Sequence, residues 1–131
     1  MMQRSLSPHE GVVKINNPTA NIIVITVAYH SEVPLSELAD SFNKQTLQPY
    51  HWLIVNNSPI TGSQIKLSAK CSFSIVNGTQ GDGFGKGCNL GLDKLQEIGW
   101  DGWVWLLNPD TLIKDQYLFE TLNRKLTTLP P

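Results

Sequence analysis

The residues whose types and spacing most clearly suggest a chemical role are Asn108, Pro109, Asp110 and Thr111. They directly follow an apolar run of the chain. A carboxylate and an amide oxygen separated by one rigid residue can share a hard divalent cation such as Mg²⁺ or Mn²⁺. Such a cation can neutralise a diphosphate leaving group, as nucleotide-sugar chemistry requires. The same residues can also form a turn in which Asp110 or Thr111 caps a helix, and spacing alone favours that simpler interpretation.

A second candidate is a segment unusually dense in glycine, made up by Gly78, Gly81, Gly83, Gly85 and Gly87. Backbone amides at the start of a helix can approach and hold a phosphate when no side chain intervenes. A flexible connection between a strand and a helix would have the same composition. Glycine content alone does not separate these two interpretations.

The standard phosphate-binding motifs fail in this segment. A dinucleotide fingerprint needs a third glycine at a position that here holds Lys86, Cys88 or Leu90. A Walker loop needs glycine in place of Gln80 and a hydroxyl residue in place of Gly87. A dinucleotide-dependent oxidoreductase therefore becomes a distant third candidate, and a P-loop NTPase is disfavoured.

The remaining reactive side chains form no recognisable site. His9, His30 and His51 follow no ligand spacing, and only His30 falls at the end of a predicted strand. Cys71 and Cys88 match neither a metal motif nor a disulfide framework, so we expect buried thiols in a reducing compartment. We expect the four tryptophans to be core residues rather than base-stacking platforms.

The composition predicts one ordinary domain that needs neither a disulfide nor a structural metal to fold. The chain has 131 residues, 40% of them hydrophobic, with ten basic and eleven acidic side chains and a formal net charge of −1. That balance argues against nucleic acid as a partner. No signal-peptide core or membrane-spanning run is visible, so we expect a cytoplasmic location, with peripheral contact to the inner face of a membrane as an option.

Apolar periodicity predicts strands that alternate with helices. The predicted strands are 21–28, 52–55, 73–76 and 103–107, and the predicted helices are 34–45, about 88–98 and 118–126, with a further short helix at 60–70. This order is typical of an α/β fold with a mainly parallel sheet and helices on both faces. Because ligands bind at the carboxyl ends of such strands, the polar loops 29–30, 56–58, 77–87 and 108–111 should meet at one edge.

Taken in order, four segments resemble the amino-terminal half of inverting family 2 glycosyltransferases of the Rossmann-like GT-A fold. They are IVITVAYHS at 23–31, WLIVNNS at 52–58, DGFGKGCNLG at 82–91 and LLNPDT at 106–111. Within this family the sequence most resembles the rhamnosyltransferase-like branch, because that branch commonly carries Asn-Pro-Asp-Thr. The resemblance spans about residues 21–127, so we expect a domain at 21–131 after a polar, poorly ordered lead-in at 1–20.

The resemblance implies a binding site for a nucleotide-diphosphate sugar. Its base and ribose would be contacted by Val27, Ala28 and Tyr29 and by the loop that carries Asn56 and Ser58. Asn56 stands where the family usually has an aspartate that binds the base, and Thr61 stands where a second acidic residue is common.

The resemblance also assigns the phosphate side of the donor. Gly83, Gly85 and Lys86 would line it, after an Asp82 that replaces a common asparagine. Asn108 and Asp110 occupy the metal-binding DxD position. Asp110 is the preferred ligand for Mg²⁺ or Mn²⁺.

The chemistry implied is displacement at the anomeric carbon by an acceptor hydroxyl, on a saccharide or a lipid-linked molecule, that a carboxylate deprotonates. That base normally lies beyond the fourth strand, so we assign no catalytic residue and expect this chain to be inactive alone. A non-catalytic nucleotide-binding or assembly module with the same fold is the alternative. An uncovered sheet edge would favour homo-oligomers.

Overall fold

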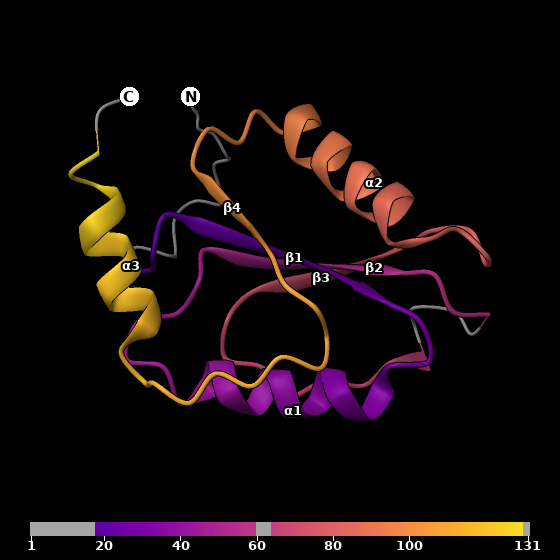
Figure 1. The fold of residues 1–131 in the computed structure, drawn as a ribbon, viewed down its shortest axis with the longest axis horizontal. Helices are drawn as coiled ribbons and strands as arrows, with labels where there is room; N and C mark the ends of the chain where they lie inside the picture. Colours follow the sequence, from indigo (N-terminus) through magenta and orange to yellow (C-terminus); the bar gives the residue numbers. More distant parts are fainter. Residues whose placement is uncertain (1–17, 60–63, 130–131) are drawn as a thin grey trace.

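The fold is a parallel α/β sheet flanked by helices on both faces, as the sequence predicts. A computed structural model describes residues 18–59 and 64–129. The elements are β1 (Ile22–Ala28), α1 (Glu32–Asn43), β2 (His51–Asn56), β3 (Phe73–Asn77), α2 (Phe84–Glu97), β4 (Trp103–Leu106) and α3 (Leu118–Leu126). The four strands are all parallel and lie in the order β3-β2-β1-β4 (Figure 1). None of the described helices is both long and apolar enough to cross a bilayer.

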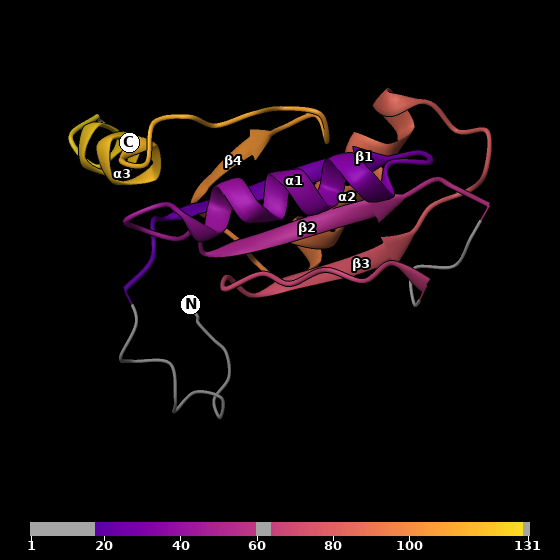
Figure 2. The ribbon, with the colours of Figure 1, turned by 90° about the horizontal axis from the view of Figure 1, so that it is seen from below.

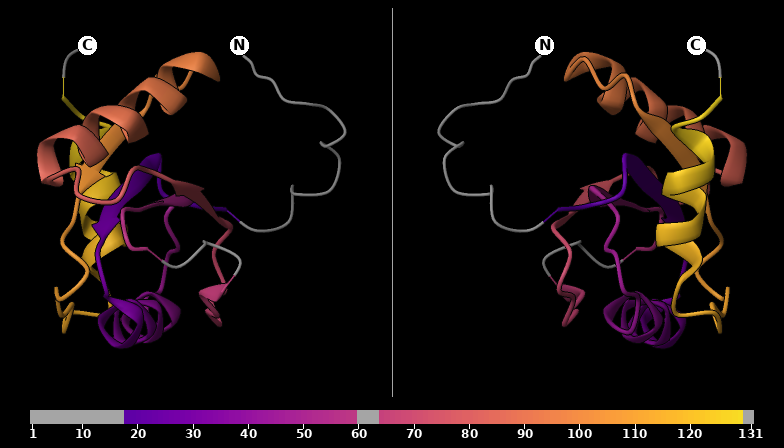
Figure 3. Two further views of the ribbon diagram at one scale, coloured as in Figure 1. Left: turned by 90° about the vertical axis from the view of Figure 1, so that its right-hand side faces the viewer. Right: turned by 90° about the vertical axis from the view of Figure 1, so that its left-hand side faces the viewer.

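The central strands β1 and β2 are buried on both faces, which is why they read as continuous apolar runs. Successive residues of a strand point to opposite faces. Ile22 and Val24 pack in the cluster that holds α1, whereas Ile23 and Ile25 pack in the cluster that holds Leu95 of α2. Viewed along the sheet, α2 lies above it and α1 below it (Figure 3).

The α1 face carries the larger core and most of the aromatic packing. Phe42 of α1 meets Trp52 of β2 edge to face, with ring centroids 4.8 Å apart, and meets Phe119 of α3 at 5.5 Å. Trp105 of β4 packs edge to face on Phe119 at 5.7 Å. The buried indole N–H of Trp52 donates to the hydroxyl of Thr26 at 3.0 Å, so the core leaves this donor satisfied.

The α2 face is thinner, because two glycines let the helix approach the sheet. A methyl group on Gly87 would lie 2.6 Å from Val27 Cγ1, and one on Gly91 would lie 2.9 Å from Ile25 Cγ2. Helix α2 ends at Glu97, and Gly99 follows its C-cap with a φ of +75°, which is costly for residues with a side chain. The backbone N–H of Trp100 then donates to the carbonyl of Leu95 at 3.0 Å.

The predicted helix at 60–70 is wrong over its described residues. Positions 64–72 contain no α-helix, and they run beside α1 beneath β3 (Figure 3). Ile65, Leu67, Ala69 and Cys71 are buried or half-buried and alternate with exposed residues, which is the two-residue period of an extended chain. Residues 60–63, and therefore Thr61, lie outside the described residues, as do residues 1–17 of the predicted lead-in.

Two helices begin earlier than the sequence indicates. Helix α1 begins at Glu32, two residues before Pro34, which a first turn accommodates because its N–H groups have no partner within the helix. Helix α2 begins at Phe84, inside the glycine-dense segment. Residues 84–87 of that segment are therefore the first turn of a helix and not a loop.

Candidate functional site

The carboxyl ends of the four strands lie at one edge of the sheet (Figure 2). Strands β1, β2 and β3 end level with one another, since Ala28 is in register with Asn56 and Asn56 with Asn77. Strand β4 ends sooner, because Leu106 is in register with Ile25. The edge is therefore stepped, and the chain after β4 leaves the sheet about three residues before β1 ends.

The loops after β1 and β2 are tied to each other. The backbone N–H of Asn57 donates to the carbonyl of Ala28 at 2.8 Å, and that of His30 donates to Ser58 Oγ at 2.7 Å. His30 has a φ of +49°, which is unusual for a residue with a side chain. Tyr29 is 54% exposed and packs edge to face on His30. The two loops thus hold an aromatic ring in solvent at the edge.

Asn56 is committed to holding the strand ends together. Its side chain is buried, its Oδ1 accepts from the backbone N–H of Ser58 at 3.1 Å, and its Nδ2 donates to Asn77 Oδ1 at 3.2 Å. The backbone carbonyl of Asn56 also accepts from the N–H of Gly78 at 2.8 Å. The structure therefore gives Asn56 the task of positioning the loops after β2 and β3.

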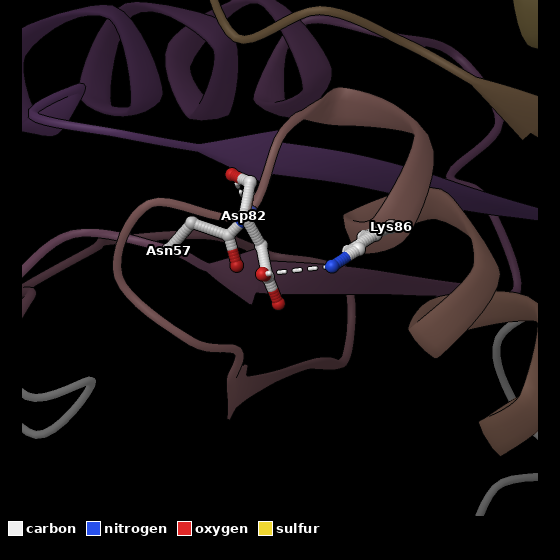
Figure 4. A network of polar contacts seen from close by, with 3 residues as sticks. All are labelled: Asn57, Asp82 and Lys86. Atoms are coloured by element: carbon white, nitrogen blue, oxygen red, sulfur yellow. Dashed lines mark hydrogen bonds and ion pairs between the residues drawn. The ribbon is translucent and has the colours of Figure 1, made fainter.

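Asn57 is a residue of this edge to which the sequence assigned no role. Its Nδ2 donates to the backbone carbonyl of Asp82 at 3.0 Å, which fixes the chain entering α2 (Figure 4). Its Oδ1 is buried without a hydrogen-bond partner among the described residues, and it occupies the space that a side chain on Gly78 would need. Two adjacent asparagines directly after a buried strand were the only sequence signal, since residue 82 is distant in the chain.

The start of α2 is open to solvent and positively polarised. Gly83 is the N-cap and offers no capping side chain, and space is open where a Cβ on Gly83 or Gly85 would lie. The first amides of a helix carry partial positive charge. Lys86 adds a full charge on a side chain that is 75% exposed, with Nζ 3.7 Å from Asp82 Oδ1 (Figure 4). Asp82 balances the charge of Lys86, so the attraction of this end of α2 for an anion comes from its open backbone amides.

Asn108 and Asp110 both lie exposed beyond β4. By the register of β4 with β1, Asn108 falls near the level of Val27 if the chain stays extended. Within the described ranges, no hydrogen bond or ion pair uses either side chain, and no group of three or more metal-ligating residues forms. The pair supplies two hard oxygen donors, which fits Mg²⁺ or Mn²⁺ when a ligand supplies the remaining oxygens.

Cys71 and His51 lie at the amino ends of β3 and β2, away from this edge, and Cys88 lies in α2 beside Gly87. Burial raises the pKa of Cys71 to about 11 and also raises the pKa of Cys88, so both free thiols are poor nucleophiles at neutral pH. His51 begins β2 at the opposite end of the sheet. Its ring nitrogens each lie 2.8 Å from a serine hydroxyl, those of Ser72 and Ser74, and burial lowers its pKa.

Comparison with solved structures agrees with this fold. The structure of S. aureus TarS 1-349, a family 2 glycosyltransferase, matches with a TM-score of 0.58 and 24% sequence identity. The match covers 81% of this chain and 31% of the TarS chain, so this chain spans less than a third of that protein's structure. No family model and no curated protein matches this sequence. The domain is therefore glycosyltransferase-like in fold, with the architecture of a GT-A half.

Proposed function

We propose that this domain binds a nucleotide-diphosphate sugar at the carboxyl edge of its sheet. The observation that carries the proposal is the division of labour among the polar residues there. Asn56, Asn57 and Ser58 are hydrogen-bonded to the protein, whereas Tyr29 and Asp110 are exposed at the same edge. Exposed groups at the carboxyl ends of parallel strands support a ligand site, because ligands of open α/β sheets bind in the crevice outside those ends.

Tyr29 is the residue best placed to contact the nucleoside. Its exposed ring stands beside the strained His30, at the end of β1. Val27 and Ala28 would fix the position of Tyr29. Val27 packs against Gly87 of α2, and the Ala28 carbonyl accepts a hydrogen bond from the backbone N–H of Asn57. Ser58 holds the backbone of His30, and Asn56 holds Ser58, so both would shape the surface that receives the base.

The diphosphate would lie between β4 and the start of α2. Asp110 would hold Mg²⁺ or Mn²⁺ together with Asn108, and the ion would neutralise the departing diphosphate. The open backbone at Gly83 and Gly85 allows close approach of phosphate oxygens, and Lys86, which pairs with Asp82, would exchange that partner for a phosphate oxygen. These roles use the exposed groups of the edge and leave the hydrogen-bonded asparagines in place.

Sugar transfer to an acceptor needs more than the donor site proposed for this domain. The match to TarS covers 31% of that chain, so we assign donor binding to this domain and no catalytic base to any of its residues. A rhamnosyltransferase-like donor preference follows only from the Asn-Pro-Asp-Thr sequence at 108–111. We expect the purified 131-residue chain to bind donor without transferring sugar.

Calorimetry tests the proposal directly. We expect UDP, GDP or dTDP to bind the purified chain in the presence of Mn²⁺, and we expect Asp110→Ala or chelation with EDTA to weaken that binding by at least about tenfold. Asp101→Ala is the matched control, because Asp101 is also an exposed acid next to β4 but lies at its amino end. The proposal fails if none of the three nucleotides binds. It also fails if neither Asp110→Ala nor EDTA weakens binding relative to the unaltered chain with Mn²⁺.

A non-catalytic nucleotide-binding or assembly module is the second candidate. The observation that favours it is the engaged side chain of Asn56, whose amide is used inside the fold where the resembling family has a base-binding aspartate. Such a module predicts nucleotide binding that neither Mn²⁺ nor Asp110→Ala alters. The same calorimetry therefore separates the two candidates.

A further inference from the structure

The side chain of Asn57 lies enclosed between the loop after β3 and the first turn of α2. The residue is 2% exposed. A Cβ on Gly78 would overlap its Oδ1, and a Cβ on Gly87 would lie 3.3 Å from its Nδ2. The reverse orientation of the amide would set its oxygen against the carbonyl oxygen of Asp82, which accepts from Nδ2 and needs a donor there. The amide therefore has one orientation, with Nδ2 toward Asp82.

An asparagine at this position has a cost within the fold. Its Oδ1 is buried and accepts no hydrogen bond among the described residues. A buried acceptor without a partner destabilises the folded state, and an apolar side chain would avoid that loss. What asparagine adds is the Nδ2 donor, which lies 3.0 Å from the Asp82 carbonyl oxygen. The benefit of this residue therefore lies at Asp82.

The Asp82 carbonyl belongs to the same peptide group as the N–H of Gly83. A trans peptide group is planar, and its C=O and N–H point in opposite directions. Because this C=O points at the buried Asn57 amide, the N–H of Gly83 points away from it. Gly83 is exposed, and within the described residues no hydrogen bond uses its N–H. The amide of Asn57 thereby aims a backbone donor outward at the N-cap of α2.

We propose that Asn57 is a positioning residue that aims the Gly83 N–H at the diphosphate of the nucleotide sugar. This inference rests on the function proposed above and adds to it a residue that touches no ligand itself. The N–H can reach a phosphate oxygen directly, because space is open where a Cβ on Gly83 would lie. A hydrogen bond to a charged phosphate oxygen is stronger than one between neutral groups. The Asn57 side chain therefore acts on phosphate binding through Gly83.

The backbone of Asn57 has a separate task on the nucleoside side. Its N–H donates to the carbonyl of Ala28 at 2.8 Å, directly before Tyr29. A substitution of the side chain leaves that backbone hydrogen bond in place. Loss of the Asn57 amide should therefore weaken phosphate binding and spare the contact of Tyr29 with a nucleoside. A general loosening of the edge would weaken both.

Amide NMR of the 131-residue chain tests the proposal with two probes, inorganic pyrophosphate and uridine. We expect pyrophosphate to shift the Gly83 amide signal. We expect Asn57→Ala to raise the dissociation constant of pyrophosphate by at least about fivefold and that of uridine by less than about twofold. Gln80→Ala is the matched control, since Gln80 carries an exposed amide in the same loop. A Gly83 signal that ignores pyrophosphate in the unaltered chain overturns the proposal, as does an equal loss of both probes in Asn57→Ala.

Gly78→Ala sharpens the test without changing a charge. A Cβ at this position overlaps Asn57 Oδ1, so we expect the variant to displace the amide and to weaken pyrophosphate binding as Asn57→Ala does. In the double variant Asn57→Ala/Gly78→Ala that overlap is gone, so the loss should equal that of Asn57→Ala alone. Losses that add up in the double variant contradict the proposal.

The positioning role and the nucleotide-sugar site can fail separately. If pyrophosphate shifts Gly83 in a manner that depends on Asn57, but UDP, GDP and dTDP do not bind, the nucleotide-sugar site is rejected and the positioning role stands. If a nucleotide binds with Mn²⁺ and Asn57→Ala leaves its affinity unchanged, the site stands and the positioning role is rejected.

Discussion

The interior beneath α1 and the carboxyl edge of the sheet use polar groups in opposite ways. Beneath α1, the buried Thr26 hydroxyl and Trp52 indole N–H satisfy each other within an apolar cluster. At the carboxyl edge, a layer of buried asparagine amides holds the loops, and charged or aromatic side chains stand outside it. The comparison separates residues that maintain the fold from residues that are free to bind.

The interior should give the largest loss of stability. Phe42 is fully buried and contacts Trp52 and Phe119 edge to face, so Phe42→Ala removes both ring contacts and leaves a cavity. We expect the free energy of unfolding to fall by about 3–5 kcal/mol, measured by urea denaturation. Val33→Ala, at a 68% exposed position of the same helix, should change it by less than about 0.5 kcal/mol. Equal effects from the two variants would contradict the packing described for α1.

On the α2 face of the sheet, two glycines separate close packing from the open carboxyl edge. A methyl group on Gly87 would overlap Val27, so we expect Gly87→Ala to lower the free energy of unfolding by about 1 kcal/mol despite the better helix propensity of alanine. Gly85 faces open space, and Gly85→Ala should leave stability unchanged or raise it by up to about 1 kcal/mol. Thermal denaturation of the pair decides the matter, and a stabilising Gly87→Ala would show that α2 is not closely packed there.

The smallest effect should come from His51, at the end of the sheet opposite the proposed site. Burial lowers its pKa below the ordinary 6.5, so the unfolded chain binds a proton more readily than the folded chain. Stability from this group is therefore present above about pH 6.5 and is lost as pH falls through and below that value.

Urea denaturation at several pH values measures this contribution. Between about pH 7.5 and pH 5, we expect His51→Gln to lose less stability than the unaltered chain, because glutamine takes up no proton in the unfolded state. Nucleotide binding at the carboxyl edge should not differ between the two proteins at pH 7.5. Identical stability curves would mean that His51 titrates alike in the folded and unfolded states.

Most of the elements could be predicted from the sequence, because their signals are local. The spacing of Leu35, Leu38, Ala39 and Phe42 predicts α1, and the apolar run after Asn21 predicts a strand buried on both faces. The prediction of a helix at 60–70 failed because the local signal is weak there. The alternating apolar residues are few, and only their packing in the core beneath β3 shows that they all point to the same side.

The candidate site was predictable in place but not in detail. Parallel strands bring their carboxyl ends together, so the convergence of the polar loops followed from the order of strands and helices. The individual roles depended on partners far along the chain. Asn57 holds the carbonyl of Asp82, and Ser58 holds the backbone of His30. No local pattern reveals these pairs.

The sequence by itself therefore determined the alternation of strands and helices, the two buried faces of β1 and the set of polar loops at one edge. These follow from side-chain periodicity and turn residues, which act within a few positions of the chain. Only the tertiary structure decided that Asn56 and Asn57 support the edge, that Gly87 packs while Gly85 stays open, and that β4 joins the sheet beside β1. Those outcomes depend on which distant segments compete for the same space, and that is settled when the layers pack.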